Sequence, residues 1–465
     1  ENEEEATRIA LAEGLLVYST LAKFKTKTVR KIYKVLIFNY VFFVGILCKY
    51  YLCKKKVMTT IIKNRKRISN IFSKIEDKEL EFLVKETGVD KYSKKLKGIE
   101  IFKLLIFGAL TDDRASLRTF ENFYITNFFK MIAKISLTKV ISHSSIAERI
   151  AKINVVFFER LFAYCVKKYA PFLEEGITSK ISSYDSTIVS ISSKLLHLGM
   201  QNGQKNKKDE QGKLSLKFTI GFSNLPFKCK IHHQQEMISE DLALGDILKE
   251  HTANKEDIAV FDRGMKDRKV MDELSDEQTQ YFVTRIYKDS KYILAEGSQV
   301  KKLDEQDEHL RLISSQKVHL FTKSQKKTKN TFRLIEGRLL KKDEKRGEIK
   351  EEKILFLSNL TDDFSDEQIA GIYRNRWKIE QYFRFIKQEL NFKHFFSRNL
   401  NGIQVMMYVI LIASILLLTY IKEEGLKGYK IPKRRFCYGL QDEIIKEIVI
   451  HCGGDPSKMY SYSDS

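Results

Sequence analysis

Apolar residues recur every three or four positions from about residue 58 to 175, as in the segments IFKLLIFGAL and NVVFFERLFAYCVKKYAPF. This spacing is typical of helices with one buried face. Ser, Thr and Asp stand at the start of TDDRASLRTFENF and SHSSIAERI in the manner of helix caps. The pattern therefore predicts a helical N-terminal domain over 58–175.

After Gly176 the pattern becomes alternating and β-rich. The segments KISSYDSTIVSIS, KLSLKFTIGFS and FKCKIHH predict three strands. They are followed by a helical segment (SEDLALGDILKEH), an apolar strand (DIAVF), a second helix (KDRKVMDELS) and a strand (QYFVTRIY). This is the element order of an RNase H-like α/β core, which we expect over 176–287. Glu236, Glu240 and Asp241 are expected to cap its first helix.

Four β-like segments interrupt the core between about 288 and 360, namely KYILAE, KVHLFTK, TFRLIEGRLL and EKILFLSNL. Lysine-rich turns such as KSQKKTKN separate them, so the pattern predicts a basic, β-rich insertion over 288–360. The positive charge of this insertion is explained either by a solvated face or by a β-ribbon that binds phosphates. The core resumes over 361–425 with one helix from Asp366 to Leu390 and a very apolar helix. The polar tail over 426–465 is expected to be irregular.

Two apolar stretches raise the question of a membrane. Val35 to Cys48 is short for a span, although counting on to Cys53 almost reaches the required ~20 residues. Ile403 to Ile421 has Gln404 as its one clearly polar residue. Because it follows a highly charged amphipathic helix, we expect a central core helix there and no stable membrane association.

Residues 1–57 are set apart from these predictions. Residue 1 is Glu, and Met58 opens the segment MTTIIKNRKRISNIF, which is typical of a natural start. Upstream sequence translated in error and the end of a truncated sequence both explain such a segment. We assign no function to 1–57, which contain the first apolar stretch.

The charge balance suggests a partner. Lys and Arg number 82 against 60 Asp and Glu, which gives a net charge of +22. Such a surplus favours polyanions, because each neutralised phosphate releases condensed counterions. The helical domain over 58–175 is therefore a candidate DNA-binding domain. An AT-rich genome would produce the same lysine excess, and a plain helical scaffold the same pattern. The six scattered cysteines include no CxxC pair, which fits a reducing cytoplasm.

Two aspartates stand at unusual positions. Asp185 lies inside an alternating strand, where Asp is disfavoured. Asp262 follows an apolar strand, and Arg263-Gly264 turns the chain into the next helix. Acids at the carboxyl ends of central strands lie where α/β proteins build sites. The alternatives are an exposed strand edge for Asp185 and a helix N-cap for Asp262.

The helix that ends at Leu390 carries four polar residues beside its apolar stripe, namely Tyr373, Arg376, Glu380 and Lys387. At ~100° per residue, their offsets of 0, 3, 7 and 14 place them within an arc of roughly 60°. An acid at the edge of a buried face is held rigidly and still meets substrate. A surface stripe of salt bridges would show the same spacing.

Together these segments resemble the DDE transposases of bacterial insertion sequences, specifically the IS-four branch with its signature Tyr-x2-Arg-x3-Glu-x6-Lys. Asp185, the Asp262–Gly264 turn and an aromatic-Val-Thr-Arg strand ending at Arg285 add to the resemblance, which covers roughly 95 to 425. The family also places a β-rich insertion between its second Asp and its Glu. The signature is matched at every spacing by Tyr373, Arg376, Glu380 and Lys387.

The resemblance implies a metal-dependent strand-transfer enzyme. Phosphodiester cleavage and strand transfer need an activated water or 3′-hydroxyl and a stabilised leaving oxygen, which two Mg²⁺ ions ~3.5–4 Å apart provide. Mg²⁺ prefers hard oxygen ligands, so three carboxylates suffice. Asp185 is expected to bridge the two Mg²⁺ ions, with Asp262 and Glu380 each holding one. Mn²⁺ is expected to substitute for Mg²⁺.

The Tyr, Arg and Lys of the signature have a separate role in the family, where they hold phosphates at the transposon end. This implies DNA contacts for Tyr373, Arg376 and Lys387. Arg263 and Arg285 are further candidates for phosphate contacts.

The chain departs from some relatives in one respect. Those relatives stack a flipped base on a tryptophan in the β-insertion, whereas the one tryptophan here is Trp377, on the signature helix. Either Tyr287, Tyr292 or Phe321 substitutes as the stacking platform, or a hairpin intermediate is not used.

The implied function is cut-and-paste DNA transposition in the bacterial cytoplasm, in association with the nucleoid. The expected partners are double-stranded DNA, as terminal inverted repeats and as target, and a second copy of the chain in a homodimer on DNA. Two other hypotheses remain, a catalytically inactive DNA-binding relic of a transposase and a membrane-associated basic protein.

Overall fold

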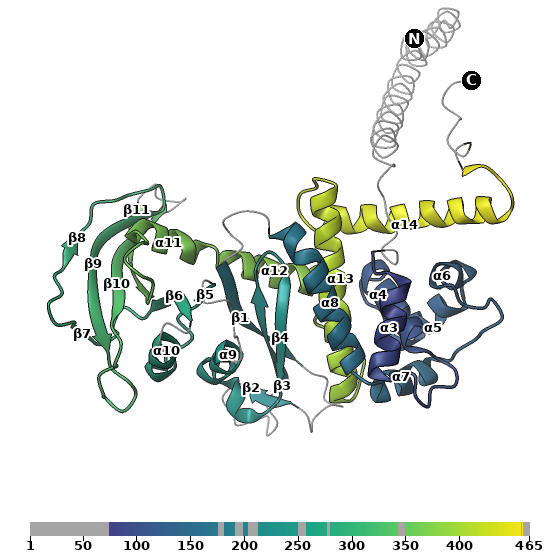
Figure 1. Cartoon of the computed structure of the whole chain (residues 1–465), viewed down its shortest axis with the longest axis horizontal. Coiled ribbons are helices and arrows are strands. Elements are labelled where there is room, and N and C mark those ends of the chain that lie inside the picture. The colour runs from purple at the N-terminus through teal and green to yellow at the C-terminus, as the bar shows by residue number, and fades with distance from the viewer. Residues whose placement is uncertain are drawn as a thin grey trace, which may run out of the picture. The chain divides into compact units, whose positions relative to one another are not determined.

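The computed structural model of the chain describes residues 74–174, 181–190, 199–202, 213–249, 257–276, 280–342, 349–456 and 458. The segment 1–57, with its apolar stretch, lies outside these residues. Within them, a mixed sheet flanked by helices forms the α/β fold that the sequence predicts (Figure 1).

Five strands form the central part of the sheet: β1 (Ile181–Ser190), β3 (Lys213–Phe222), β4 (Pro226–His232), β5 (Ile258–Phe261) and β6 (Tyr281–Ile286). Their order is β4-β3-β1-β5-β6; β3 is antiparallel to β4 and β1, whereas β1, β5 and β6 are mutually parallel. Helix α9 (Glu240–Lys249) precedes β5, and α10 (Arg268–Ser275) connects β5 to β6. This is the RNase H-like arrangement, so the predicted fold class is confirmed.

The β-rich insertion continues the same sheet. Its strands are β7 (Tyr292–Leu294), β8 (Lys301–Lys302), β9 (Leu310–Leu320), β10 (Phe332–Lys342) and β11 (Ile349–Ser358). β11 pairs with β6, β10 with β11, and β9 with β10, all antiparallel. The unpaired backbone groups along the outer edge of β6 thereby find partners. On the opposite side, β2 (Met200–Asn202) pairs with the start of β3.

Helices cover both faces of the sheet. Helices α9 and α10 lie on one face, and α11 (Asp366–Arg374) and α12 (Trp377–Glu389) lie on the other (Figure 1). The sequence predicted one helix over this second stretch, and the structure corrects that prediction. α11 packs against β5, β6 and β11, whereas α12 packs against β1, so the joint between them lies above the centre of the sheet.

The predicted N-terminal helices are also present: α3 (Asp77–Thr87), α4 (Gly98–Thr111), α5 (Leu117–Ile125), α6 (Asn127–Ala133), α7 (His143–Lys152) and α8 (Val156–Leu173). The side chain of Ser116 accepts a hydrogen bond from the backbone N–H of Thr119 and caps α5. Ser142 caps α7 in the same way through Ser145. The Ser residues that the sequence marked as helix starts therefore act as caps.

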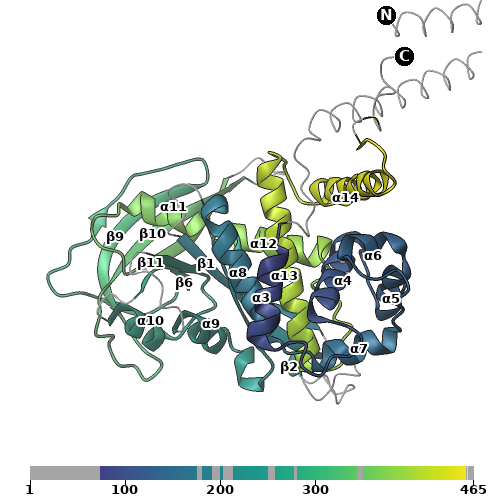
Figure 2. The same ribbon diagram turned by 45° about the vertical axis from the view of Figure 1, so that its right-hand side comes forward.

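The very apolar helix is α13 (Leu400–Glu423), which packs against α4, α7 and α8 (Figure 2). Among the described residues, α13 alone is long and apolar enough to cross a membrane, but 83% of its most apolar window is buried inside the protein. It is therefore the core helix that the sequence predicted. Its buried hydroxyls donate to backbone carbonyls within the helix, Ser414 to Leu411 and Thr419 to Ile415.

The tail is not irregular as predicted, because a helix, α14 (Lys430–His451), occupies most of it. The ring of Phe436 is buried and makes an edge contact with Tyr420 of α13, at 5.4 Å between centroids. Ile431, Tyr438 and Ile445 are exposed on the same helix. Apolar residues thus lie all around α14, which removes the periodic signal that would have predicted it.

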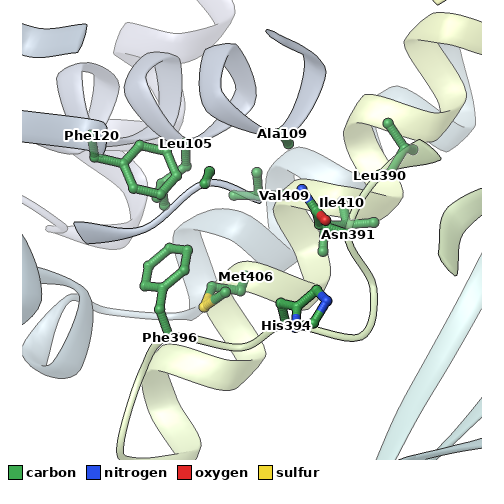
Figure 3. Close-up of a pocket in the computed structure, with 11 residues that line it drawn as sticks. Leu105, Ala109, Phe120, Leu390, Asn391, His394, Phe396, Met406, Val409 and Ile410 are labelled. Carbon is green, nitrogen blue, oxygen red and sulfur yellow. The ribbon is translucent and has the colours of Figure 1, made fainter. Parts of the chain in front are cut away.

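A small pocket lies where α4, α5 and α13 meet the segment that follows α12 (Figure 3). Its volume is about 30 Å³, and its walls are mainly the apolar side chains of Leu105, Phe120, Phe396, Met406 and Ile410. A cavity of this size holds a water molecule or two at most, and apolar walls disfavour even those. We interpret it as a packing defect of the helical core.

Candidate active site

The register of three parallel strands brings distant residues into one row. Tyr184 of β1 pairs with Phe261 of β5, and Phe261 pairs with Thr284 of β6. The residue after each of these is, in turn, Asp185, Asp262 and Arg285. Successive side chains of a strand point to opposite faces, so the three side chains of this next row point toward α11 and α12. The pairing of strands therefore explains why two acids and an arginine of the sequence motifs are neighbours.

Tyr373 of α11 connects the helix to this row. Its hydroxyl donates a hydrogen bond to Oδ1 of Asp262 at 2.9 Å, and its ring is buried against Phe356 of β11. The guanidinium groups of Arg285 and Arg376 lie 5.8 Å and 5.6 Å from the centre of the same ring. Cations at this distance are attracted to an aromatic face. Tyr373 thus holds Asp262 and two arginines in one cluster.

The joint between α11 and α12 sets the position of Arg376. The backbone N–H of Arg376 donates to the carbonyl of Tyr373 at 3.0 Å, and that of Ile379 donates to Arg376 at 3.2 Å. Bonds that span three residues are typical of 3₁₀ turns, which occur in the middle of helices at hinges and functional positions. The four signature residues therefore do not lie on one regular helix. Tyr373 belongs to α11, Arg376 to the joint, and the other two to α12.

Glu380 is held by Arg376. Oε1 of Glu380 lies 2.6 Å from the guanidinium of Arg376, and Glu380 is about one-third exposed. Arg376 also interacts electrostatically with the carboxylates of Asp185 and Asp262. Its own Nε is buried without a hydrogen-bond partner. One guanidinium thus lies among all three predicted carboxylates.

The two aspartates differ in protonation. Burial raises the pKa of Asp185 to about 7, and the charges of Glu240 and Asp262 add to the increase. Burial also acts on Asp262, but the backbone N–H of Arg263, the charge of Arg376 and the Tyr373 hydroxyl together hold its pKa below the ordinary value. Asp262 is therefore the carboxylate that stays charged, whereas burial of Asp185 outweighs the opposing charge of Arg376.

Lys387, the last signature residue, is also close to this group. Burial and the charge of Lys393 lower the pKa of Lys387, and Asp185 opposes that shift. The amine of Lys387 lies over the ring of Phe383, with 5.9 Å from Nζ to the ring centre.

Two carboxylates of the row have donor chemistry that suits divalent cations. Asp185 and Asp262 offer hard oxygens, and a cation beside them would relieve the unfavourable charge of Asp185. However, no group of three His, Cys, Asp or Glu side chains among the described residues lies close enough to hold a metal ion. Arg376 takes up Glu380 instead. Two hard-oxygen donors thus lie in the row, and the third predicted carboxylate is paired with Arg376.

The turn after β5 carries a second cluster of cations. Arg263 and Lys266 are exposed and lie 5.3 Å and 4.9 Å from the centre of the Tyr287 ring. Tyr287 is half-buried and lies beside these cations, whereas Tyr292 and Trp377 expose 36% and 51% of their surface. A base could stack on Tyr287 only where these cations leave a ring face open.

Sequence reasoning missed how the start of α9 is used. Glu240 and Asp241 were predicted to cap that helix. Instead, Oε2 of Glu240 accepts from Lys217 of β3 at 3.1 Å, and Asp241 accepts from the backbone N–H of Asp267 at 2.8 Å. The available signal was Lys217, a lysine in the middle of an alternating strand of the predicted core. Lysine is almost never fully buried without a partner, so an acidic partner could have been expected for it.

Comparison with known proteins agrees with this fold. Residues 178–416, just over half of the 465, match the family model described as "Transposase DDE domain". The chain belongs to this family of transposase domains. It is also similar to a protein of Synechocystis sp. described as "Putative transposase for insertion sequence element IS4SA". The two are 28% identical over 257 residues, which cover 53% of this chain and 62% of the relative. The resemblance to the IS-four branch is confirmed.

Proposed function

We propose that this chain is a DNA transposase that cleaves and joins phosphodiester bonds at the ends of an insertion sequence. The observation that carries the proposal is the row of Asp185, Asp262 and Arg285, covered by the Tyr-Arg-Glu signature within a transposase family domain. The proposed partners are double-stranded DNA, as element ends and as target, and a second copy of the chain, because two ends are cut together.

Asp185, Asp262 and Glu380 are the residues that would hold two Mg²⁺ ions, or Mn²⁺ in their place. When bound, the ions supply an activated nucleophile and a stabilised leaving oxygen. The row on β1, β5 and β6 supports this assignment, since two of the acids come from neighbouring strands of a rigid sheet. Tyr373, Arg285 and Lys387 would contact the DNA backbone next to the scissile phosphate, and Arg263 would contact it at the rim.

Arg376 has two roles in this proposal. Without DNA its guanidinium binds Glu380 and offsets the charge of both aspartates. A DNA phosphate is a competing anion that arginine binds through two parallel hydrogen bonds. When Arg376 turns to a phosphate, Glu380 is released toward the aspartates. The site would therefore complete its metal ligands only on DNA.

The deciding experiment uses the full-length protein and a plasmid that carries the genomic DNA on either side of its gene. The wild type is expected to nick this DNA with Mg²⁺ or Mn²⁺ and not with EDTA. Glu380→Gln is expected to lose at least about 1000-fold in cleavage rate while still binding the DNA. Glu389→Gln, the same change on the same helix, serves as the control and should retain activity.

Two outcomes would contradict the proposal. Undiminished cleavage by Glu380→Gln would remove Glu380 from the site. DNA binding by the wild type without cleavage in either metal would favour the inactive relic.

A further inference from the structure

The turn that carries Asp262 is held in the core by one buried side chain, Met265, and has few backbone hydrogen bonds of its own. It runs from Asp262 to Asp267, between the end of β5 and the start of α10. Within it, one long backbone hydrogen bond joins the N–H of Met265 to the carbonyl of Asp262 at 3.4 Å. Because both Asp262 and Arg263 belong to the proposed site, the contacts that other elements make with this turn bear on the geometry of that site.

Asp241, in the first turn of α9, provides that support. Its Oδ1 accepts hydrogen bonds from two successive backbone N–H groups, those of Lys266 and Asp267, the second at 2.8 Å. The residue is 8% exposed. A buried carboxylate that accepts two backbone N–H groups makes strong, directional bonds. The turn is thus fixed at its far end by a charged group from another element.

The neighbouring Glu240 holds the middle of the turn by packing. A Cβ atom added to Gly264 would lie 2.8 Å from Cγ of Glu240, so the turn passes directly over this side chain. Lys217 of β3 is 1% exposed and donates to Glu240 Oε2 at 3.1 Å and to the carbonyl of Ile238 at 2.5 Å. The start of α9 is therefore anchored to the sheet before it contacts the turn.

Lys323 adds a connection to the basic insertion. It lies between β9 and β10, and its Nζ is 3.1 Å from Asp241 Oδ2 and 3.5 Å from Asp267 Oδ2. Lys323 is about two-thirds exposed, so this ion pair contributes little stability. It does place the tip of a lysine-rich hairpin directly against the carboxylate that holds the turn.

We propose that Asp241 is a positioning residue for the reaction at Asp262, and that Lys323 ties the tip of the insertion hairpin to the same turn. This inference rests on the proposed function. A displacement of about 1 Å in a reacting group can reduce a rate about 100-fold, so the support of the turn bears directly on turnover. DNA held by the hairpin would be aligned with Asp262 through this one carboxylate.

The test compares Asp241→Ala and Asp241→Asn with Asp246→Asn, a change at another acid of α9 that pairs with Lys230. The readouts are the cleavage rate at saturating DNA and Mn²⁺, the DNA concentration at half-maximal rate, and hydrogen exchange of the peptide covering 262–267. Asp241→Ala is expected to lower the saturated rate about 10- to 100-fold, to leave the half-maximal DNA concentration unchanged, and to speed exchange in the turn. Asp241→Asn keeps an acceptor oxygen and should restore part of both.

Lys323→Gln tests the connection to the hairpin, with Lys326→Gln in the same turn as its control. We expect Lys323→Gln to lower the saturated rate by a few-fold and Lys326→Gln to leave it unchanged. If Asp241→Ala does not fold, Asp241→Asn and Lys323→Gln decide the question.

Faster exchange in the turn with an unchanged saturated rate would overturn the inference, and so would unchanged exchange. Failure of the proposed function would look different, because then the wild type itself would not cleave. The exchange measurement needs no DNA and would still decide whether Asp241 holds the turn.

Discussion

Helix α13 is buried in the core and the row of Asp185, Asp262 and Arg285 is partly buried, and the two regions differ in the chemistry of their side chains. In α13 the buried residues are nearly all apolar, and the few buried hydroxyls find carbonyl partners. In the row, three charged groups lie side by side, and Arg376, Tyr373 and Glu380 are packed above them. One region maximises apolar burial, and the other gathers charge where water is scarce.

The comparison shows where stability and function separate. Apolar burial stabilises the fold at any pH and salt concentration. Asp185 does the opposite, because its raised pKa means that the folded state disfavours its charged form. A site that gathers charge in this way is maintained by the stability that regions such as α13 supply.

The largest effect is expected from Asp185→Asn. It should reduce DNA cleavage by at least about 1000-fold, because it removes the carboxylate proposed to bridge both metal ions.

In EDTA the same change, Asp185→Asn, should stabilise the fold by about 1–3 kcal/mol at about pH 8. The wild type loses stability as pH rises from the unfolded-state pKa of Asp185 to its folded-state value of about 7. The stability advantage of Asp185→Asn over the wild type should therefore shrink toward about pH 5. Thermal unfolding at several pH values measures it, and an advantage that grows toward low pH would contradict the sign.

Leu411→Ala is expected to have the largest effect on stability. Leu411 is fully buried in α13, so the change should lower the free energy of unfolding by about 3 kcal/mol. The cleavage rate per folded molecule should remain that of the wild type. Leu418→Ala, at a partly exposed position of the same helix, is the control and should cost less. Equal losses at the two positions would mean that burial does not set the stability of this helix.

Arg376→Gln should separate the two proposed roles of the arginine. Without DNA, Mn²⁺ should bind the variant about 3- to 10-fold more tightly than the wild type, because Glu380 is freed and a competing cation is gone. With DNA, cleavage should fall, because a phosphate contact is lost. Titration calorimetry measures the first effect. Weaker Mn²⁺ binding by the variant would show that Arg376 organises the carboxylates and does not compete with the metal.

The smallest effect is expected from Gly264→Ala. Its new methyl group would press on Glu240, which Lys217 holds in place, and the strain should move the turn that carries Asp262. We expect a fall in cleavage rate of about 3- to 10-fold with little change in thermal midpoint. Gly371→Ala is the matched control, because nothing lies within 4 Å of an added Cβ there. An equal loss of rate at Gly371 would contradict the proposed contact.

Much of this architecture follows from local patterns. Alternation in KISSYDSTIVSIS and the apolar run before Asp262 predict β1 and β5, and Ser116 and Ser142 mark helix starts that the structure contains. The insertion strands were also predictable, but the pairing of β11 with β6 was not. A strand carries no local record of which edge it will join, because backbone hydrogen bonds are alike in every strand.

The sequence by itself determined the order of elements, the burial of α13 and the residue types of the site, because periodicity and motif spacing are local properties. The tertiary structure alone decided that Asp185, Asp262 and Arg285 share one row, that the signature helix breaks at Arg376, and that Asp241 holds the turn. It also decided that the tail forms α14, whose scattered apolar positions carry no helical signal. These features depend on register and on contacts between residues far apart in the chain, and no spacing along one segment encodes them.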